Sequence, residues 1–239
     1  MVLLEAEKLS KRFDRLTVLN DISLKVEDGQ ILGIIGPNGA GKTTLINVLT
    51  GIIPVDNGRV FFRERDITNM RAYERFRLGI GRTFQSVRPF LSLTVKENVA
   101  VAAKMRGENE STVSEALKLL DLERHSNMKA AECNLFIRKK VELAKAIVGK
   151  TYLVFLDEPF AGLVEQEIYE FIEVIKNLNK NGLTFVIVEH VVTALVKLAN
   201  KMLVIHLGAK LAEGSPSEIV SNQEVLRVYL GEQIESAGS

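Results

Sequence analysis

The sequence predicts an α/β domain that is built on a parallel sheet with helices on both faces. Short apolar runs rich in Val and Ile, which are typical of buried parallel strands, occur at residues 31–36, 152–157, 184–190 and 202–207. Helical patterns follow three of these runs, at residues 43–53, 167–179 and 192–201. Because strands and helices alternate along the chain, we expect one sheet between two layers of helices.

The beginning of the chain has a different pattern. The first 30 residues and residues 61–67 read as shorter strands with polar alternation, and the pairs Asp28-Gly29 and Asn57-Gly58 are turn signals that end them. We therefore expect an antiparallel subsheet beside the parallel sheet.

The middle of the chain, from about residue 86 to residue 149, shows no convincing strand. A capping box formed by Thr94 and Glu97 opens the first of three helical patterns, at residues 94–105, 111–122 and 137–148. A second capping box, Ser215 with Glu218, starts a short helix near the end of the chain.

These elements predict how the domain is organised. A length of 239 residues allows one sizeable core with a smaller appendage, so we expect residues 1–239 to form a single domain. Its core would comprise residues 1–85 and 150–239, with residues 86–149 inserted as a helical subdomain.

Composition restricts the possible partners. With 31 basic and 30 acidic residues the formal net charge is +1, so charge does not indicate nucleic acid or an anionic membrane surface as a partner. No apolar run approaches the roughly 18 residues of a membrane-spanning helix. The single cysteine, Cys133, excludes an intrachain disulfide framework and fits a reducing compartment. Together with an N-terminus that lacks a signal-peptide pattern, this indicates a cytoplasmic protein.

Residues 36–44, GPNGAGKTT, form a phosphate-loop motif between an expected strand and an expected helix. Its glycines let successive backbone N–H groups point at phosphate oxygens, Lys42 adds a positive charge, and the Thr43 hydroxyl can bind Mg²⁺. The loop therefore comprises these residues: Gly36, Pro37, Asn38, Gly39, Ala40, Gly41, Lys42, Thr43 and Thr44. An ordinary glycine-rich turn between a strand and a helix is the alternative interpretation.

An acidic pair forms the second half of such a site. Asp157 and Glu158 end the apolar run at residues 152–157. Asp157 at a strand end can hold Mg²⁺, usually through water, and Glu158 can orient and polarise an attacking water. An apolar run that ends in Asp-Glu is weak evidence alone, and becomes strong evidence when a phosphate loop is present.

Over nearly its whole length, the chain resembles the ATP-binding subunit of ABC transporters. The phosphate loop is followed by Gln85 in GRTFQSVRPF, by the Asp-Glu pair in VFLDEPFAGL and by His190 in FVIVEHVV, which is the order of motifs in those subunits. The Asn-Lys-x-Asp stretch that reads guanine in GTPases is not present in the two Asn-Lys pairs of this chain.

This resemblance implies a P-loop NTPase core of the RecA-like type that binds and hydrolyses ATP with Mg²⁺. It implies that Phe13 stacks on adenine, that Gln85 joins Thr43 and Asp157 around Mg²⁺, and that His190 holds the γ-phosphate. Lys42 and Glu158 complete the catalytic set. Taken singly, Gln85 could be a surface residue, His190 a loop residue and Phe13 a core residue, so the evidence lies in their order and spacing.

Finer features resemble the ATPases of branched-chain amino-acid importers and, to a lesser degree, the lipopolysaccharide-export ATPase. These features are residues 82–99, 156–163, 210–220 and 225–232. The resemblance implies permease subunits and a second ATPase subunit as partners, with residues 85–105 as the coupling surface. It places the chain on the inner face of the cell membrane, in contact with the membrane only through the permease.

The chain departs from the family at residues 133–137. The family has a Leu-Ser-x-Gly-Gln signature there, which binds the γ-phosphate held by the opposite subunit, whereas this chain has Cys-Asn-Leu-Phe-Ile. Two residues missing from a segment such as NLPFGIRKK would give the same result. Phe136 is expected to add bulk where a backbone should approach phosphate. Val164 and Glu165, which follow Ala-Gly-Leu, are also unusual.

Two functions are compatible with these residues. The first is an ATPase subunit that drives a permease, most simply one that imports amino acids. The second is a nucleotide-binding regulatory or structural subunit with little turnover of its own.

Overall fold

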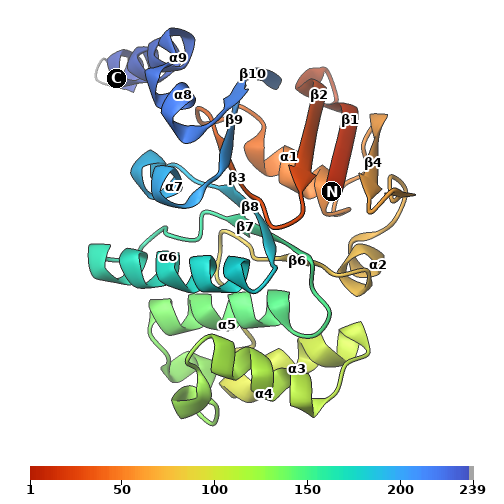
Figure 1. Cartoon of the computed structure of the whole chain (residues 1–239), viewed down its shortest axis with the longest axis vertical. Coiled ribbons are helices and arrows are strands. Elements are labelled where there is room, and N and C mark those ends of the chain that lie inside the picture. Colours follow the sequence, from red (N-terminus) through yellow and green to blue (C-terminus); the bar gives the residue numbers. More distant parts are fainter. Residues whose placement is uncertain (237–239) are drawn as a thin grey trace.

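The predicted apolar runs form the centre of a six-stranded sheet in the computed structural model, which describes residues 1–236 (Figure 1). The strands are arranged in the order β10-β9-β3-β8-β7-β6, and all neighbours are parallel except the edge strand β10. Their bounds are β3 Ile31–Ile35, β6 Ile80–Arg82, β7 Leu153–Asp157, β8 Thr184–Val188, β9 Lys201–His206 and β10 Ala209–Gly214. The prediction of a parallel sheet is confirmed.

A second sheet is antiparallel, as the sequence predicts, with the strand order β2-β1-β4-β5. Its strands are β1 Val2–Phe13, β2 Leu16–Glu27, β4 Asn57–Phe62 and β5 Arg65–Asp66. Two details of the prediction are wrong. The strands β1 and β2 have 12 residues each and are longer, not shorter, than those of the parallel sheet. Asn57 and Gly58 do not end a strand but begin β4, where Asn57 pairs with Ser10 of β1 and Gly58 passes close to the β1 backbone.

Three helices lie between β6 and β7 and sit together at one end of the molecule (Figure 1). They are α3 Val95–Arg106, α4 Glu110–Leu119 and α5 Leu135–Ile147. The predicted capping box starts α3, since Thr94 and Glu97 each accept the other's backbone N–H, at 3.1 and 2.7 Å. At the other end of α3, Arg106 donates to the carbonyl oxygens of Ala146 and Val148 and so caps α5.

The remaining helices are α1 Lys42–Leu49, α2 Ala72–Arg77, α6 Glu165–Lys180, α7 Val192–Leu198, α8 Pro216–Ser221 and α9 Gln223–Ser236. The sequence did not predict α2, β6 or β10. The strand β6 is short and contains Gly81, where a Cβ would lie 2.2 Å from the carbonyl oxygen of Ala146. Close packing against α5 therefore requires glycine in β6, and the strand lacks the apolar pattern that would have predicted it.

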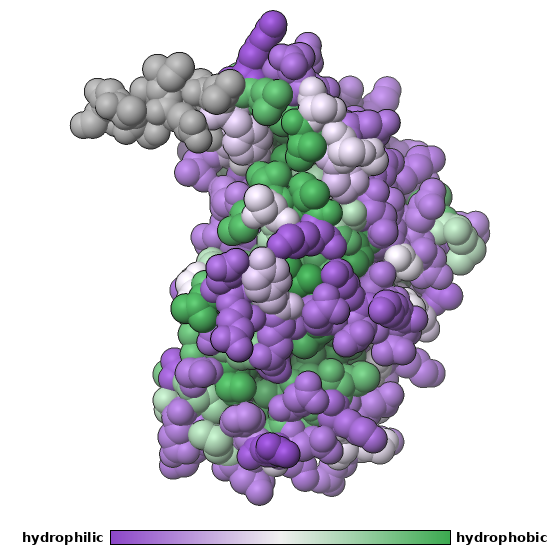
Figure 2. Space-filling view, turned by 60° about the vertical axis from the view of Figure 1, so that its left-hand side comes forward, coloured by the Kyte–Doolittle hydropathy of each residue, from purple (hydrophilic) through white to green (hydrophobic). Residues whose placement is uncertain are grey.

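The surface carries apolar side chains among polar ones, and Figure 2 shows a band of them on one face. Exposed large apolar residues belong to several elements on the outside of the fold, among them Val196 in α7, Val220 in α8 and Leu226 in α9. Such patches are typical of surfaces that contact other molecules. Among residues 1–236, no helix is long and apolar enough to cross a membrane.

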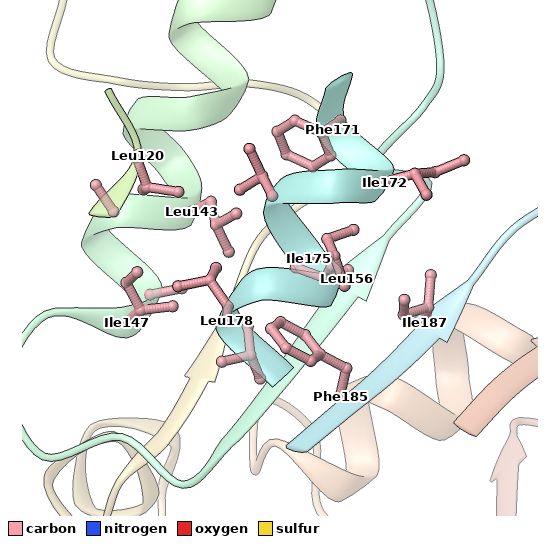
Figure 3. Packing of buried hydrophobic residues seen from close by; sticks show 14 of the residues in the cluster. Leu120, Leu143, Ile147, Leu156, Phe171, Ile172, Ile175, Leu178, Phe185 and Ile187 are labelled. Carbon is pink, nitrogen blue, oxygen red and sulfur yellow. The ribbon is translucent and has the colours of Figure 1, made fainter. Parts of the chain in front are cut away.

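The parallel sheet lies between two hydrophobic clusters, because alternate side chains of each strand point to opposite faces. On one face, residues such as Ile34 and Phe155 pack with α1 and the antiparallel sheet. On the other face, Ile187 and Leu156 pack with α5, α6 and α7 (Figure 3). Helices on both faces were predicted, and this arrangement confirms them.

Arg75 of α2 is a buried cation that holds one corner of the fold together. Its guanidinium donates to five backbone carbonyl oxygens, those of Val48 and Leu49 at the end of α1 and those of Ile67, Thr68 and Met70. Burial lowers the pKa of Arg75 to about 10, which still leaves it charged at neutral pH. The cation thus satisfies the carboxyl end of the helix that begins at the phosphate loop.

We expect Arg75→Leu to lower the free energy of unfolding by about 3 kcal/mol or more, because several buried carbonyl oxygens lose their donor at once. Chemical denaturation measures the change. Arg77→Leu, on an exposed face of the same helix, is the matched control and should change stability by less than about 1 kcal/mol. Equal effects of the two substitutions would contradict the assignment of Arg75.

Candidate active site

The candidate site lies along the carboxyl edge of the parallel sheet. The loop at residues 36–44 follows β3, Asp157 and Glu158 end β7, Glu189 and His190 follow β8, and Gln85 follows β6. Since β3, β8, β7 and β6 are neighbours and run in parallel, their carboxyl ends meet. The strand order therefore brings together segments that are far apart in the sequence.

The phosphate loop has a backbone that requires glycine at defined positions. Gly36 and Gly41 have φ values of 156° and 102°. A Cβ at Gly36 would lie 2.1 Å from the carbonyl oxygen of Ile205, and one at Gly41 would lie 2.7 Å from that of Val18. Gly41 is the N-cap of α1 and brings no side-chain hydrogen bond to the helix start. A phosphate at this helix start would therefore meet backbone N–H groups and no capping side chain.

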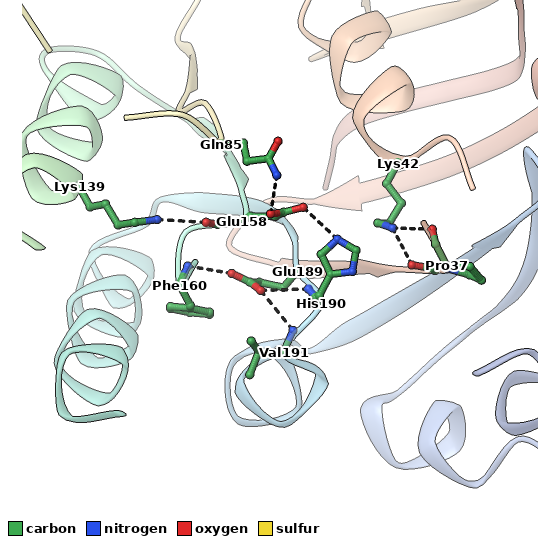
Figure 4. Close-up of polar contacts among 10 residues, drawn as sticks. Pro37, Lys42, Gln85, Lys139, Glu158, Phe160, Glu189, His190 and Val191 are labelled. Carbon is green, nitrogen blue, oxygen red and sulfur yellow. Dashed lines mark hydrogen bonds and ion pairs between the residues drawn. The ribbon is translucent and has the colours of Figure 1, made fainter. Parts of the chain in front are cut away.

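Lys42 lies in the first turn of α1, and its side chain is buried against the loop (Figure 4). Its Nζ donates to the carbonyl oxygens of Gly36 at 2.6 Å and Pro37 at 2.8 Å. These bonds hold the ammonium group inside the curve of the loop, where a phosphate would meet both its charge and the dipole of α1.

Glu158 is the centre of the polar contacts in the site. Its carboxylate accepts from Nε2 of Gln85 at 2.7 Å, and its other oxygen lies 2.9 Å from Nε2 of His190 (Figure 4). Three predicted residues from three different loops thus meet at one carboxylate. This grouping is the arrangement that can orient a water and hold a proton beside a phosphate.

The residues expected to bind Mg²⁺ offer only oxygen ligands, as this ion prefers. Thr43 is exposed in the first turn of α1, and Asp157 is buried at the end of β7. The side-chain nitrogen of Gln85 donates to Glu158, so the side-chain oxygen of Gln85 points away from Glu158. In residues 1–236, no group of three or more His, Cys, Asp or Glu side chains could hold a metal ion alone. The donor set therefore fits an ion that also takes phosphate and water as ligands.

Phe13 stands at the end of β1, in the hairpin it forms with Leu16 of β2. Its ring is 45% exposed, so it is not a core residue. The same hairpin contacts the phosphate loop through Val18, whose carbonyl oxygen lies against Gly41. Phe13 is thus an exposed aromatic ring on the β-strand pair that borders the loop.

Three charged residues of the site were not predicted from the sequence. Arg82 lies 3.2 Å from the carboxylate of Asp157, Lys139 donates to the carbonyl oxygen of Glu158, and Glu189 accepts backbone N–H groups beside His190. Burial raises the pKa of Asp157, and Arg82 opposes that rise. For Glu189, the sequence did contain a signal, because a charged residue directly after a buried strand often lies at a functional site.

The segment 133–137 forms the start of α5. Asn134 caps the helix, because its side chain accepts the N–H of Ile137 at 2.9 Å. The sequence led us to expect Phe136 at the surface that faces phosphate, and this expectation is wrong. Phe136 is buried, with the centre of its ring 6.1 Å from that of Phe171. Leu135 is exposed, at 40%, and lies against Gly162. The start of α5 therefore presents the apolar side chain of Leu135 and an Ile137 N–H that is already bonded to Asn134.

Comparison with known families and proteins gives a consistent result. The family described as ABC transporter matches residues 19–161, and the family described as branched-chain amino acid ATP-binding cassette transporter matches residues 209–235. A probable branched-chain amino acid transport ATP-binding protein, LivG of Archaeoglobus fulgidus, is 36% identical over 98% of this chain and 97% of its own length. The lipopolysaccharide export ATP-binding protein LptB of Escherichia coli is 32% identical, with 97% and 98% covered.

Among solved structures, the ADP conformation of an ATP-binding cassette from an ABC transporter is similar to the whole chain. Its TM-score is 0.90 and its sequence is 32% identical, with 97% of this chain and 99% of that chain covered. The likeness confirms the predicted P-loop NTPase fold with its antiparallel subsheet.

Proposed function

The chain belongs to the family of ABC transporter ATP-binding subunits, and on that premise we propose that it binds ATP with Mg²⁺, hydrolyses it, and powers a membrane permease. The single observation that carries the proposal is the meeting of Gln85, Glu158 and His190 on the sheet edge that also bears the phosphate loop.

The proposed roles are those that the resemblance implies, and the positions of the residues support them. Backbone amides of residues 39–44 and the side chain of Lys42 hold the phosphates, and the exposed ring of Phe13 stacks on adenine. Thr43, Gln85 and Asp157 would hold Mg²⁺, which when bound would neutralise phosphate charge. Glu158 takes the proton of the attacking water, and His190 donates to the γ-phosphate and positions Glu158 through their contact.

A pocket beside the site supports a permease as partner. It has a volume of about 380 Å³ and lies where α2, β6 and α3 meet. Ile52, Tyr73, Phe84 and Met105 line it with exposed apolar side chains. This pocket includes part of the coupling surface predicted at residues 85–105. An amphipathic segment of a membrane protein fits such a groove, and would hold the chain at the inner face of the membrane.

We propose that the transporter powered by this chain imports amino acids. The match of residues 209–235 to the branched-chain amino acid cassette family supports it, as does the similarity to LivG. The similarity to LptB makes lipopolysaccharide-type export the second candidate. A gene neighbourhood with a solute-binding protein and two permeases would support import, and one with envelope-assembly genes would support export.

The altered start of α5 leads to a further part of the proposal, that hydrolysis needs a second ATPase subunit. In a head-to-tail dimer this helix start would face the γ-phosphate of the other subunit. Leu135 and the capped amide of Ile137 offer poor partners for a phosphate oxygen. The chain's own loop and Glu158 are intact, so a partner with a Leu-Ser-Gly-Gly-Gln segment would complete one site.

We expect Lys42→Ala to weaken ATP binding by about 10- to 100-fold, because a charge-assisted contact to phosphate is worth about 1.5–3 kcal/mol. Titration calorimetry measures the affinity. Lys176→Ala, which removes an exposed ion pair with Glu173 on α6, is the control and should bind ATP as the wild type does. Unchanged affinity after Lys42→Ala would reject the phosphate site.

Glu158→Gln should keep ATP binding and lower turnover by about 10²- to 10⁴-fold, since an amide cannot accept the proton of the attacking water. Rates are compared in the preparation in which the wild-type chain is active. Equal rates would exclude Glu158 as the base.

The Glu158→Gln chain with MgATP should remain monomeric at micromolar concentration, because both interfaces would place phosphate oxygens against Leu135, and an unsatisfied charged group costs more than the about 1–3 kcal/mol of a neutral one. Light scattering gives the mass. Addition of a partner with an intact signature segment should produce an ATP-dependent dimer. A stable ATP-dependent homodimer would refute the requirement for a different partner.

A further inference from the structure

The backbone at Glu158 has a conformation that a glutamate rarely adopts. Its φ of 50° lies in the left-handed region, which is unfavourable for residues with a Cβ. Such a conformation persists only where surrounding contacts hold it. The direction of the Glu158 side chain, and hence its contacts with Gln85 and His190, depends on those contacts.

The turn after Glu158 is held from three directions. The Glu158 N–H donates to the carbonyl oxygen of Val188 in β8 at 2.9 Å, and its own carbonyl oxygen accepts the N–H of Ala161 at 3.2 Å. The same carbonyl oxygen accepts Nζ of Lys139 at 3.2 Å (Figure 4). Lys139 is buried on α5, where burial lowers its pKa and the charges of Glu189 and Glu158 oppose the change.

Glu189 joins this turn to the loop that carries His190. Glu189 is buried, with only 2% of its surface exposed. One carboxylate oxygen accepts the N–H of Phe160 at 2.8 Å, and the other accepts those of His190 at 3.0 Å and Val191 at 3.2 Å. A buried carboxylate without these three donors would be costly. Glu189 therefore fixes the separation of the loops that follow β7 and β8.

We propose that Glu189 and Lys139 are positioning residues that hold Glu158 and His190 in the geometry required for hydrolysis. Glu189 acts on both loops through backbone amides, and Lys139 acts on the peptide of Glu158 itself. Neither residue is among those assigned to ATP or Mg²⁺. Lys139 also links the base to α5, so a displacement of that helix changes the position of Glu158. This inference rests on the proposed ATPase function.

The test uses the full-length chain with Glu189→Gln and with Lys139→Met, and turnover is measured in the complex with a partner subunit in which the wild-type chain is active. Glutamine has the shape of glutamate but only one acceptor oxygen, so at least one of the three amides loses its partner. We expect hydrogen exchange of the Phe160, His190 or Val191 amides in Glu189→Gln to become about tenfold faster or more. For both variants, kcat should fall by about 10- to 100-fold while ATP affinity stays near that of the wild type, because displacement of the base affects the chemical step.

Lys140→Met is the matched control, since Lys140 is the next residue on α5, is equally buried, and pairs with Glu170 instead. Its kcat should stay at the wild-type level, and Lys139→Arg, which keeps a donor, should recover part of the lost rate. If Glu189→Gln does not fold, the comparison of Lys139→Met with Lys140→Met decides the proposal. Unchanged exchange and kcat, or an equal loss of affinity and kcat, would overturn it. A wild-type chain that binds no ATP would instead overturn the proposed function.

Discussion

The site depends on one constraint, the parallel order of β3, β8, β7 and β6. Parallel neighbours end at the same edge, so each strand delivers its next residues to a common place. The phosphate loop, the acidic pair, His190 and Gln85 come from loops separated by up to about 150 residues in the sequence. The contacts of Gln85 and His190 with Glu158 result from this topology, and the two hydrophobic clusters hold the sheet between its helices and the antiparallel sheet.

Buried charges then fix the orientation of the groups at this edge. Arg82 lies beside Asp157, Lys139 contacts the peptide of Glu158, and Glu189 binds the amides next to His190. A buried charge is stable only when its hydrogen bonds are made, so each of these side chains requires its partners to be in place. Away from the edge, Arg75 does the same for the end of α1. The polar network and the apolar core therefore specify one arrangement together.

Most of the fold could be predicted from the sequence, because its central strands are short, continuously apolar runs and its helices have clear starts such as Thr94 and Ser215. The phosphate loop and the Asp-Glu pair were equally visible as local motifs. By contrast, β6 could not be predicted, since Gly81 is set by the approach of Ala146. The inward position of Phe136 could not be predicted either, because it depends on packing against Phe171 of a different helix. Lys139 and Glu189 acquire their role only through tertiary contacts, which local sequence patterns do not contain.

The central claim is that the carboxyl edge of this sheet, and not the start of α5, binds phosphate. A crystal structure of the wild-type chain with Mg²⁺ and a non-hydrolysable ATP analogue tests this claim most directly. We expect the phosphates to contact the amides of residues 39–44, and Nζ of Lys42 to leave the carbonyl oxygens of Gly36 and Pro37 and bind the phosphates. Phosphates bound elsewhere, or a Lys42 that keeps both carbonyl contacts beside bound nucleotide, would contradict it.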